Sequence, residues 1–90
     1  MDEHKTETIF AELAERFADE VEVAEKYWSI ADQARAEGHR YLSHNLREIS
    51  AQEMHHARYL RDYLMEHGHF DKEKHKAVDE TYMRMLHRFG

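Results

Sequence analysis

Residues 17–38 read FADEVEVAEKYWSIADQARAEG, a run of helix-forming residues that ends at a glycine. Together with the residues just before it, this run carries apolar or aromatic side chains at steps of three and four, the spacing of one face of an α-helix. A glycine directly after such a run accepts the left-handed conformation that closes a helix. The stretch predicts a long amphipathic helix that ends at Gly38, with a stripe made of Phe10, Leu13, Phe17, Glu20, Ala24, Tyr27, Ala31 and Ala34.

The sequence after Gly38 repeats this spacing. A second stripe runs through the segment that ends at Gly68, and a shorter third stripe precedes Gly90. Asp71 is a suitable N-cap for the third helix, because its side chain can accept hydrogen bonds from the free backbone N–H groups of a first turn. The second stripe is Leu42, Leu46, Ile49, Glu53, His56, Leu60, Tyr63 and His67, and the third is Val78, Tyr82, Met85 and Phe89.

These stripes predict an all-α protein with helices at about residues 6–37, 40–67 and 71–89, in a single domain over residues 1–90. Two long helices joined by a short turn form an antiparallel hairpin. Because a two-helix hairpin leaves one apolar face uncovered, we expect two copies to pair into a four-helix bundle. The third helix is expected to pack on the ends of the hairpin or to join dimers into a larger assembly.

The composition narrows the function classes. A chain of 90 residues buries only about 60% of its unfolded surface when it folds alone, and it usually needs a disulfide, a metal or a second subunit. The sequence contains no cysteine, which excludes disulfides, thiolate metal sites and thiol catalysis. Its net charge of −6 argues against nucleic acids and anionic membranes as partners. No apolar run is long enough to span a membrane, and we expect a cytoplasmic protein.

Three polar residues interrupt the stripes, namely Glu20 in the first helix and Glu53 and His56 in the second. A carboxylate on a buried stripe is costly unless it is paired, protonated or bound to a metal. Glu20 lies 18 residues before Gly38, whereas Glu53 and His56 lie 15 and 18 residues after it. Residues at similar distances from the turn of a hairpin reach the same level, so these three should converge. The alternative is that they form salt bridges that only set the pairing of the helices.

The donor types favour a metal. Glu53 and His56 form Glu-x-x-His, whose i, i+3 spacing places both side chains on one face of a helix. A di-iron bundle takes one Glu from each of two helices and one Glu-x-x-His from each of the other two. One chain supplies half of this set, and a symmetric pair supplies four carboxylates and two imidazoles. The same ligands are also compatible with zinc or manganese.

At these residues the chain resembles the rubrerythrin branch of the ferritin-like superfamily. The resemblance covers about residues 10–64, including the interval from Glu20 to Tyr27, QARAEG before the turn, and QEMHHA at residues 52–57. It implies a ferritin-like bundle in which Glu20, Glu53 and His56 are iron ligands and Tyr27 hydrogen-bonds a ligand carboxylate. The alternative for Tyr27 is that it is an aromatic residue of the core with no role at the site. The chain departs from a full rubrerythrin, since it has neither a second helix pair with its own ligands nor a cysteine-rich rubredoxin module.

A short hairpin with a small third helix is also similar to the encapsulated ferritins. Chains of that family share a ferroxidase site across a subunit interface and assemble into rings of dimers inside an encapsulin shell. This resemblance implies a homodimer, a larger ring and an encapsulin compartment. It also implies that Asp19 and Glu22 form an outer site through which metal reaches the centre, while the alternative for these two residues is a solvated acidic face.

The sequence therefore leads to the hypothesis of a di-iron ferroxidase. Such a protein oxidises Fe(II) with dioxygen or peroxide at a site shared by two subunits, for iron storage or detoxification. Two alternatives stay open. A rubrerythrin-like peroxidase with an external electron donor would react much faster with peroxide than with dioxygen, and a non-catalytic helical dimerisation module would assemble without binding metal.

Overall fold

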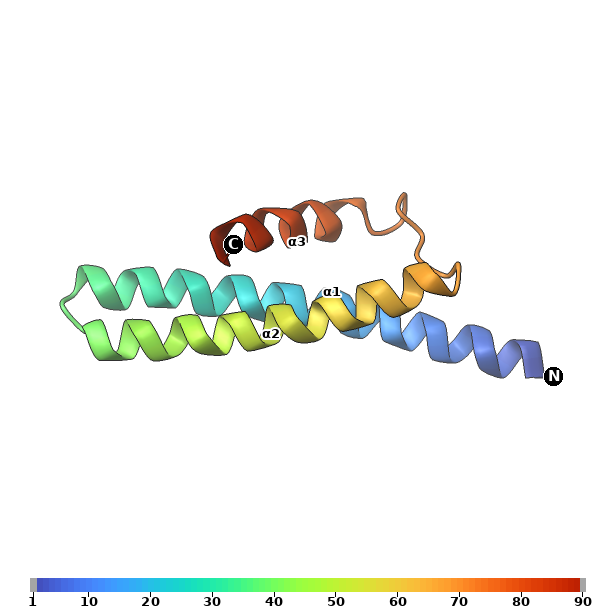
Figure 1. Ribbon diagram of the computed structural model, residues 1–90, viewed down its shortest axis with the longest axis horizontal. Coiled ribbons are helices and arrows are strands. Elements are labelled where there is room, and N and C mark those ends of the chain that lie inside the picture. Colours follow the sequence, from blue (N-terminus) through green and yellow to red (C-terminus); the bar gives the residue numbers. More distant parts are fainter. Residues whose placement is uncertain (1, 90) are drawn as a thin grey trace.

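The computed structural model describes residues 2–89, with side chains described for residues 8–89. It contains three helices, α1 (Asp2–Ala36), α2 (Arg40–Glu66) and α3 (Lys76–Phe89), and no strand within this part of the chain. The prediction of an all-α protein with three helices is confirmed. Gly90, which the sequence predicts to end the third segment, lies outside the described residues. Figure 1 shows α1 and α2 side by side as a hairpin, with α3 folded back along it.

Glycines close the first two helices in the left-handed conformation. Gly38 has a φ of +88°, and the N–H group of His39 donates to the carbonyl of Ala34 at 2.8 Å. Gly68 has a φ of +70°, and the N–H group of His69 donates to Leu64 in the same way at 2.8 Å. These bonds satisfy carbonyls that the helix leaves unpaired at its C-terminus, which explains why both helices end one residue before the predicted positions 37 and 67.

The third helix begins later than the sequence predicts. Asp71 does act as a cap, since its Oδ1 accepts hydrogen bonds from the N–H groups of Glu73 and Lys74, each at 3.1 Å. The turn that it closes covers residues 72–75, however, and the α-helix itself starts only at Lys76. A local side-chain bond of this kind favours a turn as well as a helix start, so it does not fix the helix boundary.

Small side chains make much of the contact between α1 and α2. Ala24, Ala31 and Ala57 are fully buried, and the Ser50 hydroxyl donates a hydrogen bond of 2.7 Å to the backbone carbonyl of Ala24. Small residues at a contact let two helix axes approach closely. The buried residues of α2 are Ser43, Ser50, Met54, Ala57 and Leu64.

The apolar stripe predicted for α2 lies beside this contact instead of filling it. Leu42 and Ile49 remain 50% and 36% exposed, while Ser43 and Ser50, the residues that follow them, are buried. One residue along a helix rotates the side chain by about 100°. Leu42 and Ile49 therefore lie at the edge of the contact between α1 and α2, whereas Leu60 of the same stripe packs against the buried cluster.

α3 covers the other side of the hairpin. The Phe17 ring of α1 meets the Tyr82 ring of α3 at a centroid distance of 5.5 Å, and Met85 is fully buried in the same cluster. At the C-terminal end of α3, Phe89 packs edge-on against Trp28 at 5.0 Å. The helix therefore lies along the middle of the hairpin, not at its ends. Complete burial of one large apolar side chain contributes about 1.5–3 kcal/mol, which lets a helix of this length stay docked.

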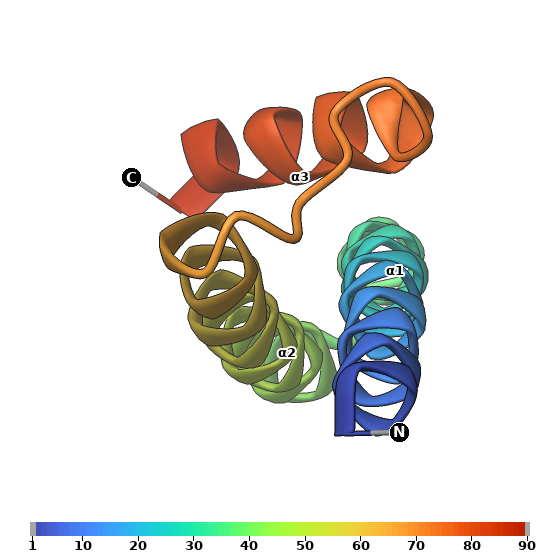
Figure 2. The same cartoon turned by 90° about the vertical axis from the view of Figure 1, so that its right-hand side faces the viewer.

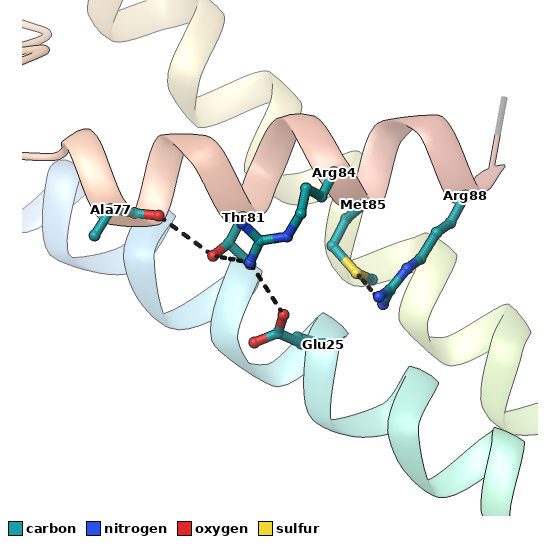
Figure 3. Close-up of polar contacts among 6 residues, drawn as sticks. All are labelled: Glu25, Ala77, Thr81, Arg84, Met85 and Arg88. Carbon is teal, nitrogen blue, oxygen red and sulfur yellow. Dashed lines mark hydrogen bonds and ion pairs between the residues drawn. The ribbon is translucent and has the colours of Figure 1, made fainter.

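Polar contacts fix α3 in register. Arg61 of α2 donates to both carboxylate oxygens of Asp79, at 2.7 and 3.2 Å, and its guanidinium lies 5.1 Å from the centroid of the Phe70 ring. The hydrogen bond to Asp79 raises the pKa of Arg61 above its ordinary value. Figure 3 shows a second contact between the helices, from Arg84 of α3 to Glu25 of α1 at 3.7 Å.

The side of the hairpin away from α3 is uncovered by any described residue (Figure 2). We call it the open face. Met54 of α2 is buried in the apolar cluster with Phe17 and Tyr82. His56 lies two residues later, about 200° around the helix, so its side chain points away from this cluster. None of the described helices is apolar over a length that could cross a membrane. Helix periodicity places the exposed apolar residues Val23, Ile30, Leu42 and Ile49 on the side of Glu20 and Glu53, and Tyr59 lines a groove beside Glu20.

Candidate metal centre

The open face holds a carboxylate that is almost completely buried. Glu20 is only 8% exposed, because it lies on α1 between Phe17 and Ala24, which both face the core. A buried carboxylate needs compensating charge or hydrogen bonds. The side chains that can provide them come from one turn earlier on α1 and from the facing turns of α2.

Glu53 and His56 of α2 reach the same point as Glu20. One ligand atom from each of the three side chains lies within 4.8 Å of the others. The convergence that the sequence spacing predicts is therefore present. Glu53 is half-buried, whereas the His56 side chain is 59% exposed and lies at the edge of the group. The donors thus form a concave group that is closed by the hairpin on one side and open to solvent on the other.

The spread of these atoms is close to that of a metal coordination sphere. Carboxylate oxygens and imidazole nitrogens bind metals at about 2.0–2.2 Å, so two donors of one ion are separated by at most about 4.4 Å. The present spread of 4.8 Å exceeds this limit slightly. The distance from His56 Nδ1 to Glu20 Oε2 is 3.9 Å, which is within this limit.

Arg16 already neutralises Glu20. Its Nη2 donates to Glu20 Oε1 at 2.8 Å from one turn earlier on α1. The Arg16 side chain is 64% exposed, so it can leave the site without disturbing the core. The guanidinium occupies a position next to one carboxylate oxygen, and a metal ion that binds this oxygen competes with it.

Sequence reasoning missed three residues of this site. A shallow groove runs along the open face, and Arg16, His55 and Tyr59 line it together with Glu20 and His56. The spacing of Arg16 and Glu20, four residues apart, could have signalled the ion pair. The side chains of His55 and His56 point in directions about 100° apart around α2. Both nevertheless line the groove, because it is wide enough to include them.

The other residues predicted for the site lie apart from it. Tyr27 is half-buried on α1, seven residues or about 10 Å along the helix from Glu20, and no described hydrogen bond joins the two. Asp19 and Glu22 are exposed and turn away from Glu20, and Glu22 pairs with Lys26 at 3.3 Å. These placements are those of a solvated acidic face within one chain.

Comparisons with known proteins add no relative to this picture. No protein-family model, curated protein or solved structure matches this chain. The convergence of Glu20, Glu53 and His56 is therefore the main observation that bears on function.

Proposed function

We propose that two copies of this chain pair through their open faces and oxidise Fe(II) at a di-iron site built from both copies of Glu20, Glu53 and His56. The observation that carries the proposal is the convergence of these three side chains, within 4.8 Å, on a face that the chain leaves uncovered. The resemblance to rubrerythrins and encapsulated ferritins supports the same ligand set.

The number of donors supports pairing. One chain offers two carboxylates and one imidazole, which is too few for two iron ions. Two chains offer four carboxylates, whose negative charge balances two divalent cations. Pairing also brings the open sides of both concave groups together and removes the site from bulk water.

The apolar surroundings support pairing as well. Leu42 and Ile49 of α2 and Ile30 of α1 are large apolar residues exposed on the face that carries the ligands. Exposed apolar surface next to a group of polar side chains is typical of an interface. A second copy of the hairpin would cover these residues and complete a four-helix bundle around the carboxylates.

The proposed reaction uses the ligands in distinct roles. The resemblance to rubrerythrin implies that the two Glu53 carboxylates would be shared between the substrate ions, while Glu20 and His56 would each hold a single ion. Two Fe(II) ions supply two electrons, which reduce dioxygen with two protons to hydrogen peroxide, or peroxide with two protons to water. Carboxylates stabilise the product Fe(III) because hard oxygen ligands suit the higher charge. Before iron binds, the guanidinium of Arg16 offsets the negative charge of Glu20.

Native mass spectrometry with anaerobic Fe(II) addition tests the proposal. We expect an even-numbered oligomer that gains two irons per pair of chains, followed by Fe(II) oxidation in air. Glu53→Gln and His56→Ala should each abolish iron uptake. His44→Ala and Glu48→Gln form a matched control, because this exposed pair lies on the same helix at 3.0 Å and away from the ligand group.

The same experiment separates the alternatives. Assembly without iron uptake would refute the di-iron centre and leave a helical dimerisation module. Uptake followed by a much faster reaction with peroxide than with dioxygen would replace the ferroxidase by a peroxidase that uses an external electron donor.

A further inference from the structure

A second concave site lies at the hairpin turn, far from the metal centre. It has a volume of about 360 Å³, which falls in the range of small-ligand pockets, about 300–1,000 Å³. We call it the cationic groove. Its lining residues are Arg35, Arg40, Ser43, His44 and Arg47.

The cationic groove continues along the side of the hairpin that α3 covers. The Arg47 guanidinium lies 4.8 Å from the centroid of the Trp28 ring, and this ring packs against Phe89 at the end of α3. Figure 1 shows that α3 ends before it reaches the turn between α1 and α2. The groove is therefore on the side of the hairpin away from the open face, and it stays accessible when two open faces pair.

The charge of this region is opposite to that of the whole protein. The chain has a net charge of −6, but residues 35–47 contain three arginines and a single acid, Glu37. No carboxylate lines the cationic groove. Two carboxylates lie at its edges, where Asp32 accepts from Arg47 at 3.0 Å and Glu48 contacts the imidazole of His44 at 3.0 Å. Among the described residues, Arg35 and Arg40 have no ion-pair partner.

The position of Arg40 is electrostatically unfavourable without an anion. Arg40 is the first residue of α2, and the N-cap, His39, makes no capping hydrogen bond with its side chain. The first turn of α2 contains no acidic residue. A helix N-terminus carries about half a positive charge, so a cation there is unfavourable. An anion bound beside the guanidinium of Arg40 would remove this unfavourable interaction.

We propose that the cationic groove binds a small multivalent oxyanion such as inorganic phosphate. Arg35 and Arg40 provide planar guanidinium groups that can each donate two hydrogen bonds to one oxyanion. The hydroxyl of Ser43 and, when protonated, the imidazole of His44 add further donors. This assignment does not depend on the metal centre, since Glu20 lies 15 residues from Arg35, or about 22 Å along α1.

Titration of the wild-type chain with sodium phosphate, at constant ionic strength in sodium chloride, tests the proposal. We expect saturable binding by calorimetry and NMR shifts confined to the amides of residues 35–47. The double variant R35Q/R40Q should bind phosphate at least tenfold more weakly. Arg40→Lys keeps the charge but loses the guanidinium, which can donate two hydrogen bonds to one oxyanion. Its affinity for phosphate should therefore fall between those of the wild type and the double variant.

The matched control is R58Q/R84Q, which removes two exposed arginines from other parts of α2 and α3. Its phosphate affinity should stay within twofold of the wild type, and circular dichroism should show the same helix content for all variants. The proposal is overturned if phosphate shifts no amides of the turn, if chloride at equal ionic strength has the same effect, or if both double variants lose affinity equally. The NMR result on the wild-type chain decides the matter even if R35Q/R40Q fails to fold.

Discussion

The two faces of the hairpin differ in how they are completed. On the covered face, α3 supplies Tyr82 and Met85, which close an apolar cluster around Phe17. On the open face, apolar residues of similar size stay exposed, and the centre of the face is occupied by two carboxylates and an imidazole. The hairpin of α1 and α2 thus has one face that α3 covers and one face that no described residue covers.

This difference separates stability from chemistry within a very small protein. The covered face contains the large buried side chains that hold the chain together, and Arg61 and Asp79 form an ion pair there. The open face contains the costly buried carboxylate Glu20 and the exposed His56. A change on the covered face should therefore act on folding, whereas a change on the open face should act on pairing and metal binding.

The largest expected effect comes from removing the Phe17 ring. Phe17→Ala should lower the free energy of unfolding by about 3–5 kcal/mol, because it deletes a fully buried side chain and leaves a cavity under α3. Urea denaturation measures this loss. Leu42→Ala on the open face, at protein concentrations low enough to prevent pairing, should cost much less. Equal losses from the two variants would show that the faces do not differ in this way.

The next effect concerns pairing. Leu42→Lys places a charge on the exposed apolar stripe, and it should weaken self-association at least tenfold, or about 1.4 kcal/mol, without loss of helix. Sedimentation velocity across a concentration series measures this change. Met83→Lys is the matched control, because Met83 is 48% exposed on α3 and should leave association unchanged. An unchanged dimer in Leu42→Lys would argue that the open face is not the interface.

A smaller effect is expected at Arg16. Arg16→Gln removes the guanidinium that competes with metal for Glu20, so the affinity for Fe(II) or Zn(II) should rise by about two- to fivefold, as expected for an ion pair worth about 0.4–1 kcal/mol. Anaerobic metal titration measures it. Arg58→Gln, which breaks a pair with Asp62 elsewhere on α2, should have no effect. Weaker metal binding in Arg16→Gln would mean that the guanidinium holds Glu20 ready for metal instead of competing with it.

The smallest expected effect is a pH dependence of the covered face. Burial raises the pKa of Tyr82 above its ordinary value of 10, an effect that Arg61 partly offsets. The unfolded chain therefore ionises this tyrosine first, and the stability that Tyr82 contributes is fully present below about pH 10 and is lost as pH rises through the folded-state pKa. Thermal melts from pH 9 to 11 should fall less steeply for Tyr82→Phe than for the wild type. Tyr41→Phe, at an exposed tyrosine, should retain the wild-type slope.

Sequence alone predicted the parts of the fold that depend on local rules. Gly38 and Gly68 mark the helix ends because only the left-handed conformation closes the last turn, and both glycines adopt it. The convergence of Glu20 with Glu53 and His56 of α2 followed from counting residues from the turn. These predictions need only the geometry of one helix and one reversal of direction.

The sequence did not predict which side of α2 would meet α1. The spacing of Leu42 and Ile49 suggested an apolar contact, whereas the actual contact uses Ser43, Ser50 and Ala57. Hydrophobic periodicity finds an apolar stripe, but close approach of two helices selects small side chains, and the two criteria differ here by one residue. Arg16 was missed for a related reason, since an exposed arginine looks like any other surface charge until its partner is known to be buried.

The hydrogen bond from the Ser50 hydroxyl to the Ala24 carbonyl, 2.7 Å long, helps to fix the position of α2 along the axis of α1 at the candidate metal site. Ala24 is one turn from Glu20, and Ser50 is one turn from Glu53, so the bond ties the two helices together directly beside the ligands. Helices packed through small, smooth side chains can slide past each other, and a slide of one turn is about 5.4 Å. That distance exceeds the 4.8 Å within which the three donors now meet. Together with the turn at Gly38, the Ser50 hydroxyl thus helps to keep Glu20 and the candidate ligands of α2 at one height.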